Sequence, residues 1–257
     1  MQTVMPARAP RIDDVGSTVA AGAGHAESDG TTAPLRRPAD RIALAHSDPA
    51  RFRTAAFFSR SRAAAAIKRA LDLIAATVLL VLTAPLTLLV AVWIKLHDGG
   101  PVLFRQTRVG RHGAIFVLRK FRSMRVDAEA DTGPVWAQAD DPRVTTVGRW
   151  MRPLGIDEIP QVWNVLRGEM SFVGPRPERP EFVRTLEAAI PHYRHRHAVR
   201  PGITGWAQVN FPYGATVEDA RRKLEYDLYY LERACVRMDL AIILRTGRQT
   251  LSGWRGR

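Results

Sequence analysis

The chain has 257 residues, of which 46% are hydrophobic and 25% are charged, a composition typical of a globular protein rather than a fibrous or fully disordered one. Its one cysteine, Cys235, excludes an intrachain disulfide and any metal site built from several cysteines, which fits a reducing compartment. Lysine and arginine outnumber aspartate and glutamate by 38 to 25, a net charge of +13. This excess predicts attraction to polyanions such as nucleic acid, anionic lipid or a phosphate-bearing substrate.

Residues 1–60 are rich in Ala, Gly, Asp, Ser, Thr and Pro and have no sustained apolar period. Such a segment cannot bury enough apolar surface to fold alone, so we expect a disordered polar tail. No basic stretch followed by an apolar core occurs near its start, which argues against a signal peptide.

The strongest signal in the sequence is Leu73–Ile94, an uninterrupted run of uncharged and mostly apolar residues. As a helix this run would be about 33 Å long, enough to reach across a bilayer. Pro85, near its middle, removes a backbone hydrogen bond and predicts a kink. Basic residues flank the run on both sides, and basic flanks favour the cytoplasm. We therefore predict a membrane-associated, re-entrant kinked helix over 61–98, with a spanning helix as the alternative.

Residues 99–257 form the predicted remainder of the fold. Strand-like segments at Val102–Gln106 and Ala114–Leu118 flank a glycine-containing turn, the pattern of a β-hairpin. From Thr216, and again from Leu240, apolar residues recur at helical spacing. The last helix is also basic, so it either packs on the core or lies on a membrane surface. The expected fold class is α/β, mostly helical, with a small domain outside the membrane.

Two adjacent carboxylates, Asp157 and Glu158, are the best candidates for chemistry. They precede a predicted short helix that begins near Pro160 and ends at Gly168. The helix dipole favours acidic residues at this position, and that is the simplest explanation for them. Their basic neighbours favour a functional explanation.

The basic residues around these carboxylates indicate a substrate that carries phosphate. Arg176 lies between two prolines, whose stiff backbone suits a guanidinium that contacts phosphate through two nitrogens. Lys120 and Arg122 belong to a second basic cluster at the end of the hairpin. Carboxylates among cations are typical of a Mg²⁺ site completed by substrate phosphates. A carboxylate can also be the nucleophile that forms an aspartyl-phosphate.

Two other segments have competing explanations. His192, His195 and His197 have the spacing of a metal cluster, but arginines alternate with them and would repel a bound cation, so we interpret them as a basic surface. The loop Arg200–Asn210 is rich in glycine and proline, and it forms either a simple turn or a surface for a nucleotide base.

Taken together, these motifs resemble one known family. In chain order they are Lys68-Arg69 with Asp72, Phe104-Arg105-Gln106 with Arg108, Lys120 to Met124, Asp157 to Gln161, Trp163-Asn164-Val165, Gly174 to Pro177, and Arg200 to Asn210. From about Lys68 to Leu251 the sequence resembles the monotopic bacterial sugar transferases, or polyprenyl-phosphate phosphoglycosyltransferases. Tyr213–Ala220 resembles the exopolysaccharide-initiating branch. The chain departs from the pattern at its polar tail, where larger members have membrane helices, and at Ala84, where members often have serine before the proline.

The resemblance implies transfer of a hexose-1-phosphate, glucose or galactose, from a UDP-sugar to undecaprenyl phosphate, with release of UMP. It places residues 99–257 as a catalytic domain on the cytoplasmic face of the inner membrane. It implies that Asp157 is the nucleophile, that Glu158 is its partner, and that both hold Mg²⁺. The expected phosphate-binding residues are Arg176, Lys120, Arg122 and Arg152. The expected nucleotide-binding residues are Arg200, Thr204 and Gln208.

Two other classes of function are the alternatives. A non-enzymatic, membrane-anchored scaffold of a polysaccharide export complex would need neither the Asp157-Glu158 pair nor Arg176 between its prolines. A nucleic-acid binder would explain the charge, but the sequence contains no recognisable reading module or pattern of stacking aromatics. We expect UDP-sugar, undecaprenyl phosphate and membrane lipid as partners, and no nucleic acid; other glycan-assembly enzymes are further candidates.

Overall fold

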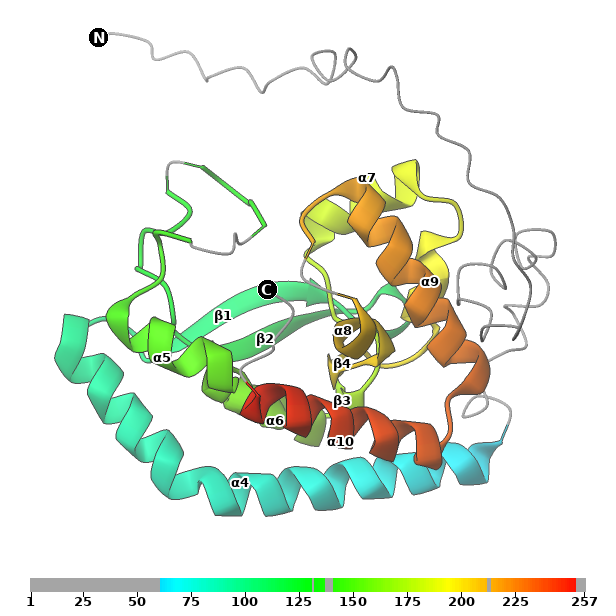
Figure 1. Ribbon diagram of the computed structural model, residues 1–257, viewed down its shortest axis with the longest axis horizontal. Coiled ribbons are helices and arrows are strands. Elements are labelled where there is room, and N and C mark those ends of the chain that lie inside the picture. Colours follow the sequence, from blue (N-terminus) through cyan, green and yellow to red (C-terminus); the bar gives the residue numbers. More distant parts are fainter. Residues whose placement is uncertain (1–60, 131, 137–140, 212–213, 253–257) are drawn as a thin grey trace, which may run out of the picture. The chain divides into compact units, whose positions relative to one another are not determined.

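The computed structural model describes residues 61–130, 132–136, 141–211 and 214–252. The predicted polar tail, residues 1–60, lies outside the described residues. All the described residues belong to one compact unit of the chain, Arg36–Arg257. This part is mostly helical, with two small two-stranded sheets among the residues described, which confirms the predicted fold class (Figure 1).

Helix α4, Arg62–Asp98, is the long apolar helix expected from the sequence. The Ser61 side chain caps its start by accepting a hydrogen bond from the Ala64 amide. Gly99, at φ 68°, ends it in the left-handed conformation that glycine adopts without steric cost. The helix continues through Pro85 and bends along its length (Figure 1). By length and composition it could cross a membrane.

Both halves of α4 pack on the same folded body. Near its start, Lys68 Nζ pairs at 2.6 Å with Oδ2 of Asp239 on helix α10, Val236–Leu251. Near its end, Val90 and Ile94 are buried in an apolar cluster with residues of the hairpin and of the next helix. A straight spanning helix would separate its ends by the bilayer thickness, so one body could not hold both. These contacts favour the re-entrant topology over the spanning one.

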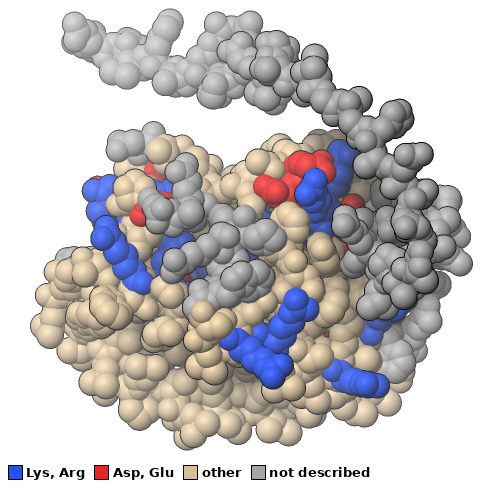
Figure 2. Space-filling model, viewed as in Figure 1, with Lys and Arg blue, Asp and Glu red and all other residues tan. Residues whose placement is uncertain are grey.

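Most of the remaining surface of α4 is apolar and exposed. Exposed large apolar side chains continue from it onto α5 (Thr146–Leu154) at Trp150 and onto α10 at Leu240 and Leu244. These helices lie along the same side of the structure as α4 (Figure 1). On the face drawn in Figure 2, the rim along the middle of α4 shows no charged side chain. A continuous apolar surface of this kind is typical of a membrane-contacting protein.

The predicted hairpin is present. Strand β1 (Leu103–Val109) pairs antiparallel with β2 (Ile115–Phe121), and a short turn joins them. Phe116 and Leu118 of β2 are buried while Ile115 and Val117 are exposed, as expected when one face of a strand lies on the core.

A second sheet was not predicted from the sequence. Strands β3 (Ser171–Val173) and β4 (Gly202–Thr204) pair in parallel. The pairing brings Gly174 very close to the segment before β4. A Cβ atom on Gly174 would collide with the carbonyl oxygen of Arg200. Glycine is therefore required where the chain leaves β3 towards Arg176.

Helix α6, Val162–Leu166, is shorter than predicted. The chain before it, including Pro160, forms a 3-10 turn, so the α-helix begins at Val162. Val162 and Val165 face the core as expected. Arg69 of α4 donates to the carbonyl oxygens of Val165 and Leu166, at 2.7 and 3.0 Å, which satisfies the last turn of the helix.

The helix predicted from Thr216 is α9, Val217–Arg233. The Thr216 side chain accepts from the Asp219 amide, and the Asp219 carboxylate accepts from the Thr216 amide, a capping box. Of the two interpretations of the last helix, α10, packing on the core is confirmed, because Ile242 is fully buried. Leu244 is 70% exposed, and contact of this side with a membrane stays a prediction.

An ion pair inside the core ties α9 to the 3-10 segment η5, Tyr193–Ala198. Arg196 and Asp227 are 6% and 1% exposed; Arg196 Nε donates to Asp227 Oδ2 at 2.9 Å, and Nη2 lies 2.8 Å from the same oxygen. A third nitrogen donates to the Tyr193 hydroxyl at 3.1 Å. Helix α7 (Pro180–Ala189) contributes to the apolar cluster around this pair. The predicted basic surface is therefore wrong for Arg196, which is a core residue.

The first prediction concerns the topology of α4. In a Cys235→Ser background, single cysteines at Ser61 and at His97 should both be protected from a membrane-impermeant thiol reagent added outside intact cells. The physical reason is that the two ends of α4 contact one folded body. Reaction of one site from outside and not the other would show that the helix spans. Pro85→Leu is the comparison, because an unbroken apolar helix satisfies its own backbone in lipid and should shift the labelling towards spanning.

The second prediction concerns the buried ion pair. Arg196→Met should lower the free energy of unfolding by about 3–5 kcal/mol, because it leaves the buried Asp227 carboxylate without its partner. The double variant Arg196→Met/Asp227→Leu should recover most of that loss, because no charge stays buried. Denaturant unfolding of the detergent-solubilised protein, followed by circular dichroism, measures both. Equal losses in the single and double variants would contradict this account.

Candidate active site

The candidate carboxylates lie in the 3-10 turn η4, Ile156–Gln161, directly before α6. Gly155, at φ 66°, ends α5 and turns the chain into η4, a backbone conformation that favours glycine. Asp157 is 7% exposed and Glu158 is partly buried. The turn therefore holds two carboxylates in a largely enclosed position at the edge of the core.

Glu158 is the residue at which the predicted site comes together. Its Oε1 accepts a hydrogen bond from Lys120 Nζ at 3.1 Å and another from Arg176 Nη2 at 2.6 Å. Lys120 comes from β2 and Arg176 from the segment after β3, so each sheet supplies one cation. Burial lowers the pKa of Lys120, and the neighbouring Glu158 and Asp157 carboxylates act in the opposite direction. Four of the residues singled out from the sequence are thus neighbours.

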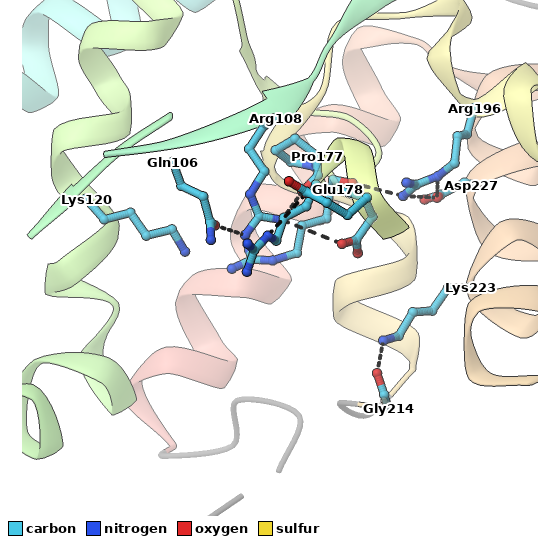
Figure 3. Close-up of polar contacts among 12 residues, drawn as sticks. Gln106, Arg108, Lys120, Pro177, Glu178, Arg196, Gly214, Lys223 and Asp227 are labelled. Atoms are coloured by element: carbon cyan, nitrogen blue, oxygen red, sulfur yellow. Dashed lines mark hydrogen bonds and ion pairs between the residues drawn. The ribbon is translucent and has the colours of Figure 1, made fainter. Parts of the chain in front are cut away.

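The backbone that carries Arg176 is held rigidly. Arg196 Nη2 donates to the Arg176 carbonyl oxygen at 2.9 Å, and Arg108 Nη1 donates to the Pro177 carbonyl oxygen at 2.9 Å. Arg108 also pairs with Glu178 at 3.5 Å. Figure 3 shows Arg108 and Arg196 on opposite sides of the chain at Pro177 and Glu178. The Arg176 side chain is itself 42% exposed, so a fixed backbone presents a guanidinium that is open to a ligand.

Asn164 positions the carboxylate turn, a role that no sequence pattern indicated. It is fully buried; its Oδ1 accepts from the Arg119 amide at 3.1 Å, and its Nδ2 donates to the Val117 carbonyl oxygen at 2.7 Å. Its Nδ2 also donates to Glu169 at 2.6 Å. These bonds join α6, and with it η4, to the strand that carries Lys120. The only sequence signal was the place of Asn164 within a motif of the resemblance.

Lys223 of α9 is a further cation beside the site that the sequence did not single out. Its Nζ donates to the Gly214 carbonyl oxygen at 2.8 Å (Figure 3). Burial lowers the pKa of Lys223, and Glu178 is the carboxylate that most opposes this shift. Arg176 and Arg196 contribute to lowering it, which places Lys223 within electrostatic range of the site.

Two predicted phosphate-binding residues lie elsewhere in the packing. Arg122, directly after β2, is 5% exposed and packs against Gly100, where a Cβ would lie 2.5 Å from its Nη1. Arg152 lies on α5 and is partly buried. Their assignment to phosphate binding stays a prediction.

The three predicted nucleotide-binding residues lie on or beside β4 and the short helix α8, Trp206–Asn210. Their side-chain hydrogen bonds run from Arg200 Nε to the Gly168 carbonyl oxygen at 2.8 Å, between Thr204 and Thr246 at 2.7 Å, and from Gln208 Nε2 to the Ile203 carbonyl oxygen at 3.3 Å. In this structure the bonds tie the loop to its neighbours, and binding of a nucleotide by these residues stays a prediction.

The histidine segment belongs to the packing behind the site. The His192 and His195 rings stack at 5.5 Å, and His197 meets the Tyr193 ring edge-on at 6.2 Å. Burial, together with the neighbouring Arg196, lowers the pKa of His197 to about 4. His197 is therefore neutral at pH 7 and adds no positive charge next to Arg196.

The carboxylates of η4 have the donor chemistry that Mg²⁺ prefers. Among the residues that the structure describes, no group of three or more His, Cys, Asp or Glu is placed to hold a metal by itself. Mg²⁺ is commonly bound by one or two carboxylates and completed by substrate phosphates and water. Asp157 and Glu158 fit that arrangement, in which a phosphate-bearing substrate supplies further ligands.

Comparison with known sequences identifies the family of the chain. Residues 63–253 match the family described as bacterial sugar transferase. The chain is 47% identical over 191 residues to the UDP-N-acetylgalactosamine-undecaprenyl-phosphate N-acetylgalactosaminephosphotransferase of Aeromonas hydrophila, covering 74% of this chain and 45% of that protein. It is 47% identical over 184 residues to an undecaprenyl-phosphate glucose phosphotransferase of Komagataeibacter xylinus, covering 70% of this chain and 35% of the relative.

A third relative is similar to this chain over more of its own length. It is the UDP-glucose:undecaprenyl-phosphate glucose-1-phosphate transferase of Caulobacter vibrioides, 48% identical over 183 residues, with 70% of this chain and 67% of the relative aligned. The chain thus spans less than half of the first two relatives and about two thirds of the third. The shared region includes α4, both sheets and the carboxylate turn. On the strength of this match, the chain belongs to the bacterial sugar transferase family.

Proposed function

We propose that this chain transfers a hexose-1-phosphate from a UDP-sugar to undecaprenyl phosphate and releases UMP, at the cytoplasmic face of the inner membrane. The observation that carries the proposal is the meeting of Glu158 with Lys120 and Arg176, next to Asp157 and close to an exposed apolar helix. A charged site at a membrane surface suits one water-soluble phosphate donor and one lipid phosphate acceptor. The relatives named above are transferases of glucose and N-acetylgalactosamine phosphates to undecaprenyl phosphate. For this chain we propose glucose or galactose.

In the first proposed step, a carboxylate oxygen of Asp157 attacks the β-phosphorus of the UDP-sugar. A bond forms between Asp157 and the sugar phosphate, while the bond from the β-phosphorus to the bridging oxygen breaks, so UMP leaves with that oxygen. Lys120 and Arg176 lie where they would stabilise the negative charge on the phosphate oxygens. The burial of Asp157 restricts the access of water, which would otherwise hydrolyse the adduct.

In the second proposed step, a phosphate oxygen of undecaprenyl phosphate attacks the phosphorus of the adduct. The bond to Asp157 breaks, the carboxylate is regenerated, and the product is a lipid diphosphate sugar that would initiate exopolysaccharide or a related glycan. Dividing one transfer into two displacements at a carboxylate predicts ping-pong kinetics. Glu158 holds both cations in place, since its Oε1 is their common acceptor.

We propose that Asp157 and Glu158 bind Mg²⁺ together with the substrate pyrophosphate. When bound there, the ion would neutralise the charge that develops as UMP leaves. The role of this chain's residues is to supply two oxygen donors from a single turn and to keep the two cations within reach of the same phosphates.

The third prediction tests the reaction and its nucleophile. The full chain in detergent, given undecaprenyl phosphate and a panel of UDP-sugars, should release UMP with at least one donor. With that donor alone it should release about one UMP per enzyme and gain the mass of a hexose phosphate. Asp157→Asn should abolish the adduct and lower turnover on the order of 10³-fold or more, because the amide is not a nucleophile. The matched control is Asp127→Asn, at a carboxylate that is 69% exposed and outside the site.

Two other outcomes of this experiment would contradict the proposals. Absence of UMP release with every donor would refute the proposed function. Turnover with intersecting initial-velocity lines, and with no adduct by intact mass, would show that donor and acceptor react directly and that Asp157 is not the nucleophile.

The fourth prediction concerns the metal. Excess EDTA should abolish UMP release, and Mg²⁺ added beyond the chelator should restore it, because the pyrophosphate charge must be compensated as UMP leaves. Thermal unfolding measured in the same EDTA buffer is the control for loss of folded protein. Full turnover in excess chelator would remove the metal from the mechanism.

A further inference from the structure

An apolar groove lies between the second half of α4 and helix α5. Its floor is formed by the buried side chains of Val90 and Met151, and its rim by more exposed residues that include Leu89, Trp93 and Trp150. The groove has a volume of about 260 Å³, and all of its lining residues are apolar or aromatic. Its rim belongs to the exposed apolar surface described above, so the groove opens towards the membrane side.

The groove and the charged site are formed in part by consecutive residues of the chain. Ile156 lines the groove, and the next residue is Asp157. On β2, Phe121 belongs to the apolar cluster beneath the groove, and the preceding residue is Lys120, which binds Glu158. Successive side chains of a strand point to opposite faces, so β2 sends one side chain to each environment. The change from apolar to charged surroundings therefore takes place over one residue, which suits a molecule whose apolar chain is attached directly to an anionic group.

We propose that this groove binds the isoprene units next to the phosphate of the polyprenyl phosphate acceptor. The inference rests on the proposed function and adds to it a binding site for the lipid chain. A cavity of about 150 Å³ holds a six-carbon ring, so the groove has room for roughly ten carbons, or two isoprene units. The rest of the chain would lie in the bilayer along the apolar surface.

The architecture distinguishes a polyprenyl phosphate from a bulk phospholipid. A glycerophospholipid has a polar glycerol ester between its phosphate and two acyl chains. In this protein Ile156, the residue directly before Asp157, lines the groove, and none of the lining residues is polar. The charged site next to the groove contains the cations Lys120 and Arg176, which complement a phosphate on a single chain.

The experiment uses the full chain in nanodiscs with a polyprenyl phosphate that carries a diazirine on its first isoprene units. After irradiation, mass spectrometry should find the label on residues 86–93 and 150–156. Excess undecaprenyl phosphate should remove this label, and equal phosphatidylglycerol should not. Label spread over the exposed face of α4, or removed equally well by phosphatidylglycerol, would show that the groove holds bulk lipid and would overturn the proposal.

A pair of variants provides the kinetic test. Leu89 and Leu82 are 68% and 73% exposed on the same helix, and only Leu89 lines the groove, so a larger side chain is tolerated by the fold at both positions. Leu89→Trp should raise the KM for undecaprenyl phosphate about tenfold by displacing part of one isoprene unit. The KM for the UDP-sugar should stay unchanged, and Leu82→Trp should behave as the unaltered chain.

The two proposals fail in different ways. If the unaltered chain releases no UMP with any UDP-sugar, the proposed function fails, whatever the labelling shows. If the unaltered chain is active, but Leu89→Trp leaves the KM for undecaprenyl phosphate unchanged and the label lies outside the groove, only the groove assignment fails.

Discussion

The structure depends on one constraint, which is that a long apolar helix is held at both halves by a single folded body. The second half is held by the buried side chains of Val90 and Ile94, and the first half by polar side chains near the start of α4. Lys68 pairs with Asp239, whose other carboxylate oxygen accepts from Tyr230 at 2.8 Å. Asp72 accepts from both the hydroxyl of Ser171 and the amide that follows it, at 3.1 Å each. Because β3 leads directly to Arg176, the long apolar helix is tied to the elements that build the site.

Buried polar groups provide the rigidity of that site. A buried charge or amide is costly unless each of its atoms is paired, and a fully paired group holds its partners in one arrangement. Asn164 joins η4 to the hairpin in this way. Arg196, paired with Asp227, fixes the Arg176 carbonyl. The exposed guanidinium of Arg176 is thus supported by a second arginine that never reaches the solvent.

The change from apolar to charged surroundings takes place between consecutive residues. On β2 it occurs between Phe121 and Lys120, and at the start of η4 it occurs between Ile156 and Asp157. The alternation of side chains along β2 and the tight turn η4 produce this sharp boundary, at which apolar and charged side chains follow each other directly. The proposed function, which joins a water-soluble donor to a lipid acceptor, requires such a boundary, because the reacting groups must meet at the membrane surface.

The sequence by itself determined the features that depend on neighbouring residues. The apolar run of α4, the hairpin, the helix that begins after Thr216 and the candidate pair Asp157-Glu158 were all predicted, because hydrophobic periodicity and short motifs are local. The details of their boundaries were less accurate, as at Pro160, where a 3-10 turn replaces the first turn of the expected helix.

Only the tertiary structure decided which distant residues meet. Strands of three residues carry no readable period, so the pairing of β3 with β4 came from packing alone. Arg196 looks like a surface residue in a basic stretch, yet it is buried because Asp227, 31 positions away, compensates its charge. Lys120 and Glu158 are 38 positions apart and meet because Asn164 joins their elements. Such contacts depend on the packing of whole elements, which local sequence patterns do not encode.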